Sequence, residues 1–296
     1  MASRRLNNTW LRCVPHPCRT NQLKHSLSFV DMDAFESAIS LVNQSALVTG
    51  ASRGIGHAIA LALAKEGANL AVTGRDQVEL ERLQAEIENL GRHCLISVFD
   101  LTDFEAAERF HALAESQLGR VVILINNAGV GSSADPKPVV AFDYDFWDYT
   151  LRVNLTAPYR LCKCAVKAVI PRGYGRIINI ASVAGKTGTV HGAAYAASKH
   201  GLLGLTRSLA MEVVRNNITV NAVCPGVVKS RMNDKRLAYD ASRLGRTIAD
   251  IEATSTPLGC RMTPEEIAHF VVMLALPGAG AATGQAYVIV GGSMSS

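Results

Sequence analysis

The sequence predicts an α/β fold in which helices cover both faces of one doubly wound parallel sheet. From about residue 45 to residue 290, short apolar runs of strand length alternate with stretches of helical periodicity, and this alternation is typical of parallel sheets. A glycine-rich turn separates the first run from the first helix. The 296 residues are 48% hydrophobic and 19% charged, enough for one large domain or two small ones. Because no repeat or second core interrupts the alternation, we assign residues 43–296 to one domain.

The first half of this domain is predicted to contain four strands joined by helices. The helix after the first strand presents Ile55, Ile59 and Leu63 at i, i+4 spacing, which gives it one apolar face. Asp103 precedes a later helix in the position of an N-terminal cap. The elements in order are strand Ser45–Thr49, a helix to about Gly67, strand Asn69–Thr73, helix Gln77–Leu90, strand His93–Phe99, a helix of approximately Phe104–Leu118 and strand Val121–Ile125.

The second half continues the pattern with longer helices. The predicted elements are helix Trp147–Ile170, strand Ile177–Ile180, a helix from Tyr195, strand Ile218–Ala222, helix Pro264–Leu276 and strand Ala286–Val290. The segment Val227–Thr256 loses the apolar rhythm and is rich in charge, Ser and Thr. A stretch of this length in a compact fold is more often a functional lid than an idle loop. We therefore expect a lid at about residues 227–256.

Residues 1–42 precede the predicted sheet as an N-terminal extension. Residues 1–30 contain no acid, so they carry a charge of +5, equal to that of the whole chain, through the residues Arg4, Arg5, Arg12, Arg19 and Lys24. The remaining residues sum to zero and give no argument for a nucleic-acid surface. An acid-free start with arginines is compatible with an organelle transit peptide. The alternatives are a flexible extension or a true start at Met32, and Asp31–Val42 is predicted to form a lead-in helix.

Cysteine usage and hydropathy favour an intracellular protein. The seven cysteines are scattered and odd in number, and no second pair completes a metal site with Cys13 and Cys18. No apolar run approaches the roughly 18–20 residues that span a bilayer. We expect reduced thiols, no metal, no membrane span and a cytoplasmic location, or an organelle matrix if the basic start is a transit peptide.

The glycine-rich turn predicts a binding site for a phosphorylated cofactor. Gly50, Gly54 and Gly56 lie between the first strand and its helix. Glycines at such a turn let the backbone approach a pyrophosphate, and the free amides of the helix N-terminus favour an anion. The order of strand, glycines and amphipathic helix makes this signal stronger than the glycines alone.

The second strand predicts which nicotinamide cofactor is bound. Folds that bind NAD usually place an acid about 20 residues after the glycine-rich turn, to hold the ribose 2′-hydroxyl. Here Gly74 and Arg75 follow the second strand, and Arg53 lies within the first turn. Two guanidinium groups suit a 2′-phosphate, so we expect NADPH. A shift of one or two positions would place Asp76 at the acidic position, and two solvated arginines are the remaining alternative.

A serine, a tyrosine and a lysine predict a proton-transfer site. Tyr195 lies thirteen residues after Ser182, and Lys199 four residues after Tyr195. On a helix, residues at that last spacing share one face, roughly 5–6 Å apart between Cβ atoms. An ammonium at this distance favours the phenolate and moves the pKa of the phenol toward neutrality. Taken alone, a tyrosine followed at this spacing by a lysine is common by chance, and most such pairs are solvated.

Six motifs in this order resemble the short-chain dehydrogenase/reductase family. They are Thr49-Gly50-x-x-x-Gly54-x-Gly56, Asn126-Asn127-Ala128-Gly129, Asn154, Ser182, Tyr195-x-x-x-Lys199 and Pro225-Gly226, and the likeness covers about residues 43–292. The local sequence is most similar to 3-oxoacyl reductases of fatty-acid and polyketide synthesis. The resemblance implies a Rossmann fold and an NADPH-dependent reduction of a ketone to a secondary alcohol.

The resemblance also assigns roles to single residues. Tyr195 is expected to be the general acid and Ser182 to bind the carbonyl oxygen. Lys199 is expected to lower the pKa of Tyr195 and hold the nicotinamide ribose, and Asn154 to support a water-mediated proton relay. The other expected cofactor contacts are Gly50, Ser52, Arg53, Gly54, Ile55, Gly56, Arg75, Asp100, Leu101, Asn127, Ala128, Gly129, Pro225, Gly226, Val228 and Ser230. Ser230 departs from the family's usual threonine but keeps a hydroxyl.

Substrate and partners follow least directly from the sequence. Val183, Thr189 and His191 are the expected pocket residues, His191 either as a hydrogen-bond donor to substrate or as a brace for its own loop. The lid cations Lys229, Arg231, Lys235, Arg236 and Arg243 either meet the phosphopantetheine of an acyl carrier or coenzyme A, or are solvated. We expect a 3-oxoacyl thioester or similar β-dicarbonyl, with a hydrophobic ketone without a carrier as the alternative. A homotetramer is implied by the resemblance, and an idle cofactor-binding scaffold is the distant alternative.

Overall fold

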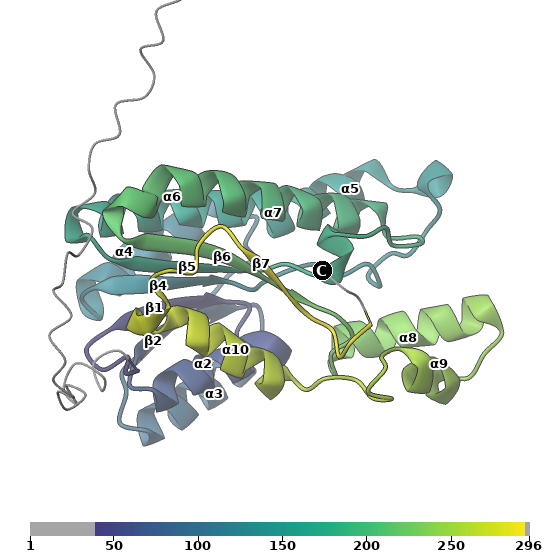
Figure 1. Cartoon of the computed structure of the whole chain (residues 1–296), viewed down its shortest axis with the longest axis horizontal. Coiled ribbons are helices and arrows are strands. Elements are labelled where there is room, and N and C mark those ends of the chain that lie inside the picture. Colours follow the sequence, from purple (N-terminus) through teal and green to yellow (C-terminus); the bar gives the residue numbers. More distant parts are fainter. Residues whose placement is uncertain (1–38, 294–296) are drawn as a thin grey trace, which may run out of the picture.

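A computed structural model describes residues 39–293 of the chain. Seven parallel strands form one sheet in the order β3-β2-β1-β4-β5-β6-β7 (Figure 1). The strands are β1 (Ser45–Thr49), β2 (Asn69–Gly74), β3 (Cys94–Val98), β4 (Val121–Asn126), β5 (Gly175–Ile180), β6 (Ile218–Pro225) and β7 (Ala286–Ile289). The predicted doubly wound parallel sheet is confirmed, and the seven predicted strands differ from the observed ones only at their ends.

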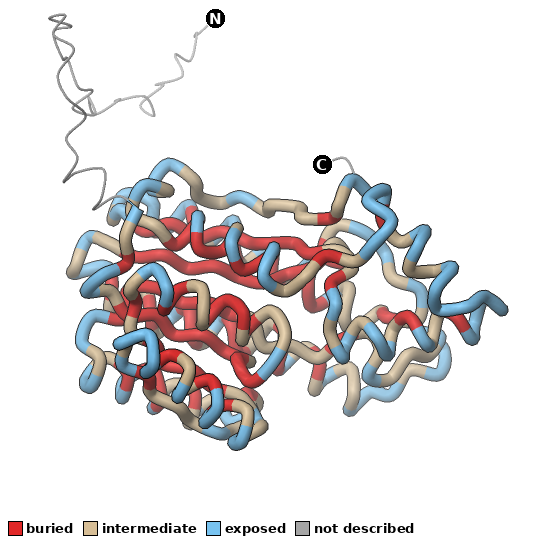
Figure 2. Tube along the Cα trace, turned by 90° about the horizontal axis from the view of Figure 1, so that it is seen from below, coloured by how far each residue is buried: buried red, intermediate tan, exposed pale blue. Residues whose placement is uncertain are grey.

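Helices cover both faces of the sheet and enclose two cores. One face carries α2 (Gly54–Lys65), α3 (Gln77–Asn89) and α10 (Pro264–Ala275), and the other carries α4 (Phe104–Gln117), α5 (Tyr144–Leu151), α6 (Ala157–Val169) and α7 (Ala193–Val213) (Figure 1). Buried apolar side chains of the strands pack against α2 and α10 on one side and against α4, α6 and α7 on the other. Figure 2 shows the strands as the most completely buried part of the chain.

The sheet reverses its order between β1 and β4, and this reversal positions the site. β1 pairs with β2 on one side and with β4 on the other, all in parallel. In sheets of this kind the helices leave the sheet in opposite directions at the reversal, which opens a crevice at the carboxyl ends of the strands. The turn after β1 and the turn after β4 both lie at this edge.

Local sequence explains where most helices begin. Asp76 caps α3 by accepting from the amide of Glu79, and Asp103 caps α4 by accepting from the amide of Ala106. α2 differs, because its N-cap residue Arg53 makes no capping hydrogen bond and its first turn contains no acid. The amides at the start of α2 therefore remain available for an anion.

Two predicted segments have a different structure. The predicted helix Trp147–Ile170 is divided into α5, a π-helical turn at Arg152–Thr156, and α6. The expected lid at 227–256 contains two helices, α8 (Arg231–Leu244) and α9 (Ile248–Thr254), which extend from the body beside the carboxyl edge of the sheet (Figure 1). Most of the predicted lead-in helix lies outside the described residues, and residues 39–42 are not helical.

Within residues 39–293, no helix is both long and apolar enough to cross a membrane. The same part of the chain contains no group of three or more His, Cys, Asp or Glu side chains that is arranged to hold a metal ion.

Candidate active site

The glycine-rich turn forms a close-fitting backbone cradle. Gly50 has φ of +66°, and a Cβ there would lie 2.7 Å from Cα of Ala128. A Cβ at Gly56 would lie 2.3 Å from both Asn127 Nδ2 and the Gly50 carbonyl oxygen. Gly54 also has a positive φ, but among the described residues the one atom within 4 Å of a Cβ there is Ser230 Cβ at 3.9 Å, so this side of the turn is open. With the uncapped start of α2, this cradle fits a pyrophosphate.

The turn after β4 supports the cradle through hydrogen bonds to β1. Asn127 Nδ2 donates to the carbonyl oxygens of Thr49 at 2.9 Å and Gly50 at 3.0 Å. The Ala128 amide donates to Thr49 Oγ1 at 3.1 Å. Deeper in the sheet, Asn126 Nδ2 donates to Asn179 Oδ1 at 2.8 Å. Asn127 therefore joins β4 to β1 across the reversal point, and Asn126 joins β4 to β5 on the other side.

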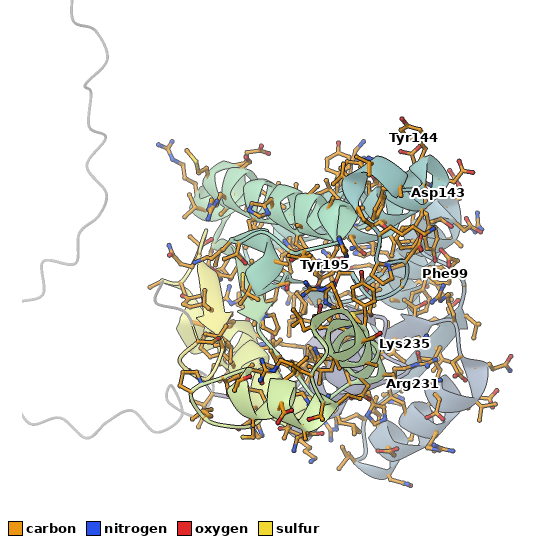
Figure 3. All side chains as sticks on the ribbon, turned by 90° about the vertical axis from the view of Figure 1, so that its right-hand side faces the viewer. Phe99, Asp143, Tyr144, Tyr195, Arg231 and Lys235 are labelled. Carbon is orange, nitrogen blue, oxygen red and sulfur yellow. The ribbon has the colours of Figure 1, made fainter. Side chains whose placement is uncertain are left out.

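Tyr195 and Lys199 lie on the first two turns of α7, and Ser182 follows β5. Lys199 Nζ is 5.8 Å from the centroid of the Tyr195 ring and donates to the Ile180 carbonyl oxygen at 2.7 Å. Ser182 and Lys199 are both buried. Figure 3, which looks onto the carboxyl edge of the sheet, shows Tyr195 near the centre of that face. The sequence-predicted trio therefore meets at one place.

Burial changes the pKa values of Tyr195 and Lys199. Enclosure raises the pKa of Tyr195, and the hydrogen bond with the Ser182 side chain lowers it by less. Enclosure also lowers the pKa of Lys199 to about 8, since an ammonium loses its hydration in the interior. In this structure the net pKa of Tyr195 is therefore raised, because the loss of solvent outweighs the hydrogen bond with Ser182. That Lys199 lowers this pKa stays a prediction.

Asn154 lies in the π-helical turn between α5 and α6. Its Oδ1 accepts from the amide of Val130 at 2.7 Å, and its Nδ2 donates to the Val130 carbonyl oxygen at 2.9 Å and to Ser198 Oγ at 3.0 Å. A Cβ at Gly129 would lie 3.3 Å from Asn154 Oδ1 and 3.7 Å from Lys199 Nζ. Asn154, Gly129 and Lys199 are thus neighbours, and π-turns of this type occur frequently at functional sites.

The two arginines expected at a 2′-phosphate both have acidic partners. Arg53 Nη2 is 3.1 Å from Asp76 Oδ2, and Arg75 Nη1 is 3.3 Å from Asp100 Oδ2. Asp76, the residue that a shifted alignment would place as the ribose acid, caps α3 and pairs with Arg53 instead. Gly74 lies against Ser52, because a Cβ there would be 2.9 Å from Ser52 Oγ. Beside the cradle, Ile55 is half-buried.

Asp100 follows β3 and is held by several donors. Its Oδ1 accepts from the amide and the hydroxyl of Thr102, at 2.9 and 2.8 Å, and its Oδ2 accepts from the Tyr149 hydroxyl at 3.1 Å. Partial burial acts to raise the pKa of Asp100, but these hydrogen bonds and the charge of Arg75 outweigh it, so the pKa is lowered. Leu101, the next residue, is buried.

The segment after β6 connects the cradle to α8. The Gly226 amide donates to the Ile289 carbonyl oxygen at 2.9 Å, and Val228 forms an isolated bridge with Met262. Ser230 Oγ caps α8 by accepting from the amide of Asn233 at 3.2 Å. Pro225 ends β6 and is buried. The Ser230 hydroxyl therefore has a structural role in starting α8, next to Gly54.

α8 is attached to both loops that flank Tyr195. Ser133 Oγ donates to the Met232 carbonyl oxygen at 2.9 Å, and the Met232 side chain fills the space where a Cβ at Gly131 would lie, at 2.5 Å. On the other loop, Arg236 Nη2 donates to the Val190 carbonyl oxygen at 3.0 Å, and His191 Nδ1 is hydrogen-bonded to the Tyr239 hydroxyl.

The expected pocket residues lie around this attachment. His191 has φ of +56°, an unusual conformation for a residue other than glycine. Thr189 lies near Ser132, since a Cβ at Gly192 would be 2.8 Å from Thr189 Cγ2 and 2.9 Å from Ser132 Cβ. Val183 begins the short helix that Ser182 caps. Sequence reasoning missed Met232, Tyr239 and Tyr149, and no periodicity or spacing in the chain singles them out.

Comparison with known proteins agrees with this geometry. Residues 44–240 match the family model of short chain dehydrogenases. The chain belongs to this family of oxidoreductases, the short-chain dehydrogenases and reductases, as its fold and its Ser-Tyr-Lys arrangement indicate.

Two relatives and one solved structure show which kinds of family member the chain is similar to. The chain is 37% identical over 256 residues to the 3-oxoacyl-acyl-carrier-protein reductase FabG of Rickettsia conorii, covering 86% of this chain and 99% of the relative. It is 39% identical over 252 residues to nodulation protein G of a Rhizobium species, covering 85% and 97%. A crystal structure of an actinorhodin polyketide ketoreductase variant with NADPH superposes with a TM-score of 0.79 at 36% identity, covering 84% and 96%.

Proposed function

We propose that this chain reduces a ketone to a secondary alcohol with NADPH and that Tyr195 is the general acid. The observation that carries the proposal is the meeting of Ser182, Tyr195 and Lys199 at the carboxyl edge of the sheet, next to the glycine cradle. A bound NADPH supplies the hydride for the carbonyl carbon. Tyr195 donates its phenolic proton to the carbonyl oxygen, and the raised pKa keeps the phenol in the required neutral form at pH 7.

Three residues assist this proton transfer. Ser182, which already bonds to the phenol, donates a hydrogen bond to the same carbonyl oxygen. Lys199 binds the ribose of the nicotinamide and supports the charge that develops on Tyr195. Asn154 holds the Gly129–Val130 backbone beside Lys199 and supports a relay that returns a proton to Tyr195 through water.

The choice of NADPH rests on Arg53 and Arg75. Their ion pairs with Asp76 and Asp100 are solvent-exposed, with arginine side chains 49% and 68% exposed. Exposed pairs of this kind contribute only about 0–1 kcal/mol, so a doubly charged 2′-phosphate can compete for the guanidinium groups. The polyketide ketoreductase relative with NADPH supports the same choice.

The proposed substrate is a 3-oxoacyl thioester carried on an acyl carrier or coenzyme A. Arg236 and Arg243 both pair with Asp240, and unlike the pairs of Arg53 and Arg75 these are largely enclosed, with arginine side chains 16% and 30% exposed and Asp240 18% exposed. A phosphate therefore competes poorly for them, and we do not count them as candidates for a phosphate contact. By contrast, Lys229, Arg231 and Lys235 are exposed, and none of them forms an ion pair with another residue of the described part of the chain. Figure 3 shows Arg231 and Lys235 on α8, on the same face as Tyr195. A relative that acts on an acyl carrier protein supports this class.

The experiment is an NADPH-oxidation screen across acetoacetyl-CoA, a longer 3-oxoacyl thioester, aryl ketones and steroid ketones. We expect the thioesters to be turned over best. An R231Q/K235Q variant should raise KM for the thioesters about twofold to thirtyfold, since two exposed charge contacts contribute roughly 0.2–1 kcal/mol each. KM for a simple ketone should be unchanged, and Arg120→Gln, an exposed cation at the start of β4, is the matched control.

Two results would overturn parts of this proposal. Good turnover of simple ketones with none of the thioesters would exclude the carrier and favour a hydrophobic ketone, for which the Met232 side chain above Gly131 supplies an apolar wall. NADPH binding without turnover of any ketone would contradict the reductase itself and favour a cofactor-binding scaffold.

We also propose that the chain assembles as a homotetramer. The proposal rests on the family resemblance, since many such reductases pair through the helices that correspond here to α5–α6 and α7. Each of α6 and α7 exposes a single large hydrophobic side chain, Tyr159 at 51% and Met211 at 82%. Light scattering at micromolar concentration tests the assembly, and a monomer mass would contradict it.

A further inference from the structure

Tyr149 lies between the two charged residues that follow β2 and β3. Its hydroxyl accepts from Arg75 Nη1 at 3.0 Å and donates to Asp100 Oδ2 at 3.1 Å. Arg75 and Asp100 are themselves 3.3 Å apart. One phenol of α5 therefore connects two loops of the sheet edge where the proposed cofactor's adenosine end would bind.

This contact holds one edge of the Arg75 guanidinium. Nη1 is occupied by Tyr149 and Asp100, whereas no residue in the range 39–293 accepts from Arg75 Nε or Nη2. The Nε–Nη2 edge is one of the edges with which an arginine binds a phosphate through two parallel hydrogen bonds. Tyr149 thus holds the guanidinium by one side while a bidentate edge stays available.

Tyr149 is better suited to holding the Arg75 guanidinium than the ion pair between Arg75 and Asp100 is by itself. The Arg75 side chain is 68% exposed, so its pairing with Asp100 alone is a weak constraint. A tyrosine ring has only two rotatable bonds, and Tyr149 is half-buried on α5, a helix that Asp143 caps. The hydroxyl also occupies a lone pair of Asp100 Oδ2, which keeps that carboxylate directed toward Thr102 and Tyr149.

We propose that Tyr149 is a positioning residue that determines cofactor specificity, by holding Arg75 in the orientation that binds the 2′-phosphate of NADPH. The proposal deepens the NADPH-dependent reduction proposed above and rests on it. α5 continues through the π-turn directly to Asn154, so the same helix supports both the adenosine end and the catalytic end of the cofactor site.

The test compares Tyr149→Phe with the wild type by calorimetric titration with four ligands. Two carry a 2′-phosphate (NADPH and adenosine 2′,5′-bisphosphate), and two lack it (NADH and 5′-AMP). Because Tyr149 acts on the 2′-phosphate only through the orientation of Arg75, its loss should weaken binding of the first pair about threefold to tenfold, less than the loss of a direct hydrogen bond to a charged group. Binding of NADH and 5′-AMP should stay within about twofold, because neither engages the guanidinium edge and because the amide and hydroxyl of Thr102 still hold Asp100 in the variant. The kcat at saturating NADPH should be unchanged.

Two further variants control the interpretation. Tyr144→Phe removes a phenol from the same helix, but Tyr144 is 88% exposed and lies at the outer edge of the face in Figure 3, so it should leave all four affinities unchanged. In an Arg75→Gln background, Tyr149→Phe should no longer change the ratio of NADPH to NADH affinity, because its effect passes through Arg75.

The outcomes separate this proposal from the reductase proposal. Equal weakening of all four ligands by Tyr149→Phe, or an undiminished effect in the Arg75→Gln background, would overturn the specificity role and leave the reductase intact. A wild-type chain that binds the bisphosphate no more tightly than 5′-AMP would overturn both the specificity role and the choice of NADPH. Absence of ketone turnover, with the expected binding pattern preserved, would overturn only the reductase.

Discussion

Tyr195 and Lys199 are ionisable groups that the fold removes from solvent. Enclosure moves the pKa of each in the direction that favours its neutral form, upward for the phenol and to about 8 for the ammonium. In the reduction proposed here, a neutral Tyr195 and a charged Lys199 are the active pair. Near pH 7 both residues are in these states.

Tyr195→Phe should abolish most turnover and leave the cofactor in place. Proton transfer by a positioned side chain contributes about 10²–10⁴-fold to rate, so kcat should fall by about that factor. The dissociation constant of NADPH, measured by fluorescence quenching, should change by less than about twofold, because the phenol acts on substrate. Lys199→Ala should damage both. Substantial activity of the Tyr195→Phe variant would require a different proton donor.

The pH dependence of kcat/KM reports on Lys199. Because its pKa in the folded chain is about 8, the ammonium is present below that pH and is lost as the pH rises through it. Tyr195 keeps its proton over the same range because its pKa is raised. We therefore expect reduction to slow above about pH 8. A profile of kcat/KM that stays level to pH 10 would contradict this assignment.

The contribution of Lys199 to the free energy of unfolding should have the opposite pH dependence to kcat/KM, because it rises rather than falls above about pH 8. In the unfolded chain a lysine stays charged to about pH 10.4, whereas in the folded chain it is neutral above about 8. The cost of burying the charge is therefore fully present below pH 8 and is relieved as the pH rises from 8 toward 10.4. This contribution to the free energy of unfolding should be absent from Lys199→Met in denaturant titrations across that range.

At the scale of elements, the segment predicted to be a lid forms a pair of helices attached to the two loops beside Tyr195. α8 contacts the loop after β4 through Met232 and the loop before α7 through Arg236 and Tyr239. The lid is also connected to the segment before α10, where Arg261 pairs with Asp234 at 2.6 Å and with Glu252 at 2.9 Å. A change in α8 is therefore expected to affect the substrate pocket before it affects the glycine cradle.

Tyr239→Phe should raise KM for the ketone by about twofold to tenfold, since one neutral hydrogen bond contributes roughly 0.5–1.5 kcal/mol. The reason is that His191, four residues before Tyr195, loses the partner that orients it. The dissociation constant of NADPH should be unchanged. Steady-state kinetics and calorimetry check the two quantities, and an effect on NADPH binding equal to that on KM would show that α8 does not act on substrate selectively.

At the scale of the whole molecule, a buried arginine connects distant segments on the side of the sheet opposite the site. Arg176 of β5 is 1% exposed and donates to the carbonyl oxygens of Gly175, Asn217, Leu276 and Pro277. Its guanidinium also lies 4.4 Å from the centroid of the Tyr174 ring. Burial lowers the pKa of Arg176, and within residues 39–293 its charge is compensated by uncharged carbonyl oxygens and the Tyr174 ring and by no acidic side chain.

Arg176→Met should lower the free energy of unfolding by about 2–4 kcal/mol, because it leaves buried carbonyl groups without donors. Urea titration followed by circular dichroism measures the change. Arg120→Met, at an exposed position before β4, should change stability by less than about 0.5 kcal/mol. Equal stability of the two variants would show that water replaces the guanidinium in the interior.

The sequence by itself determined the features that depend on local spacing. The alternation of apolar runs predicts the parallel sheet, and the glycines predict the cradle, because the close contacts at Gly50 and Gly56 leave no space for a Cβ and Gly50 also has a positive φ. The shared helical face of Tyr195 and Lys199 follows from the helical period alone.

The tertiary structure decided the features that join residues far apart in the chain. Tyr149 meets Arg75 across 74 residues and Asp100 across 49, and His191 meets Tyr239 across 48. The raised pKa of Tyr195 also depends on the tertiary structure, since every element packed around the phenol contributes to its burial. Such contacts depend on how helices pack across the sheet. This packing cannot be predicted from the periodicity of apolar residues along the chain. The trio proposed to be catalytic was therefore predictable from the sequence, whereas the residues proposed to position the cofactor and the substrate were not.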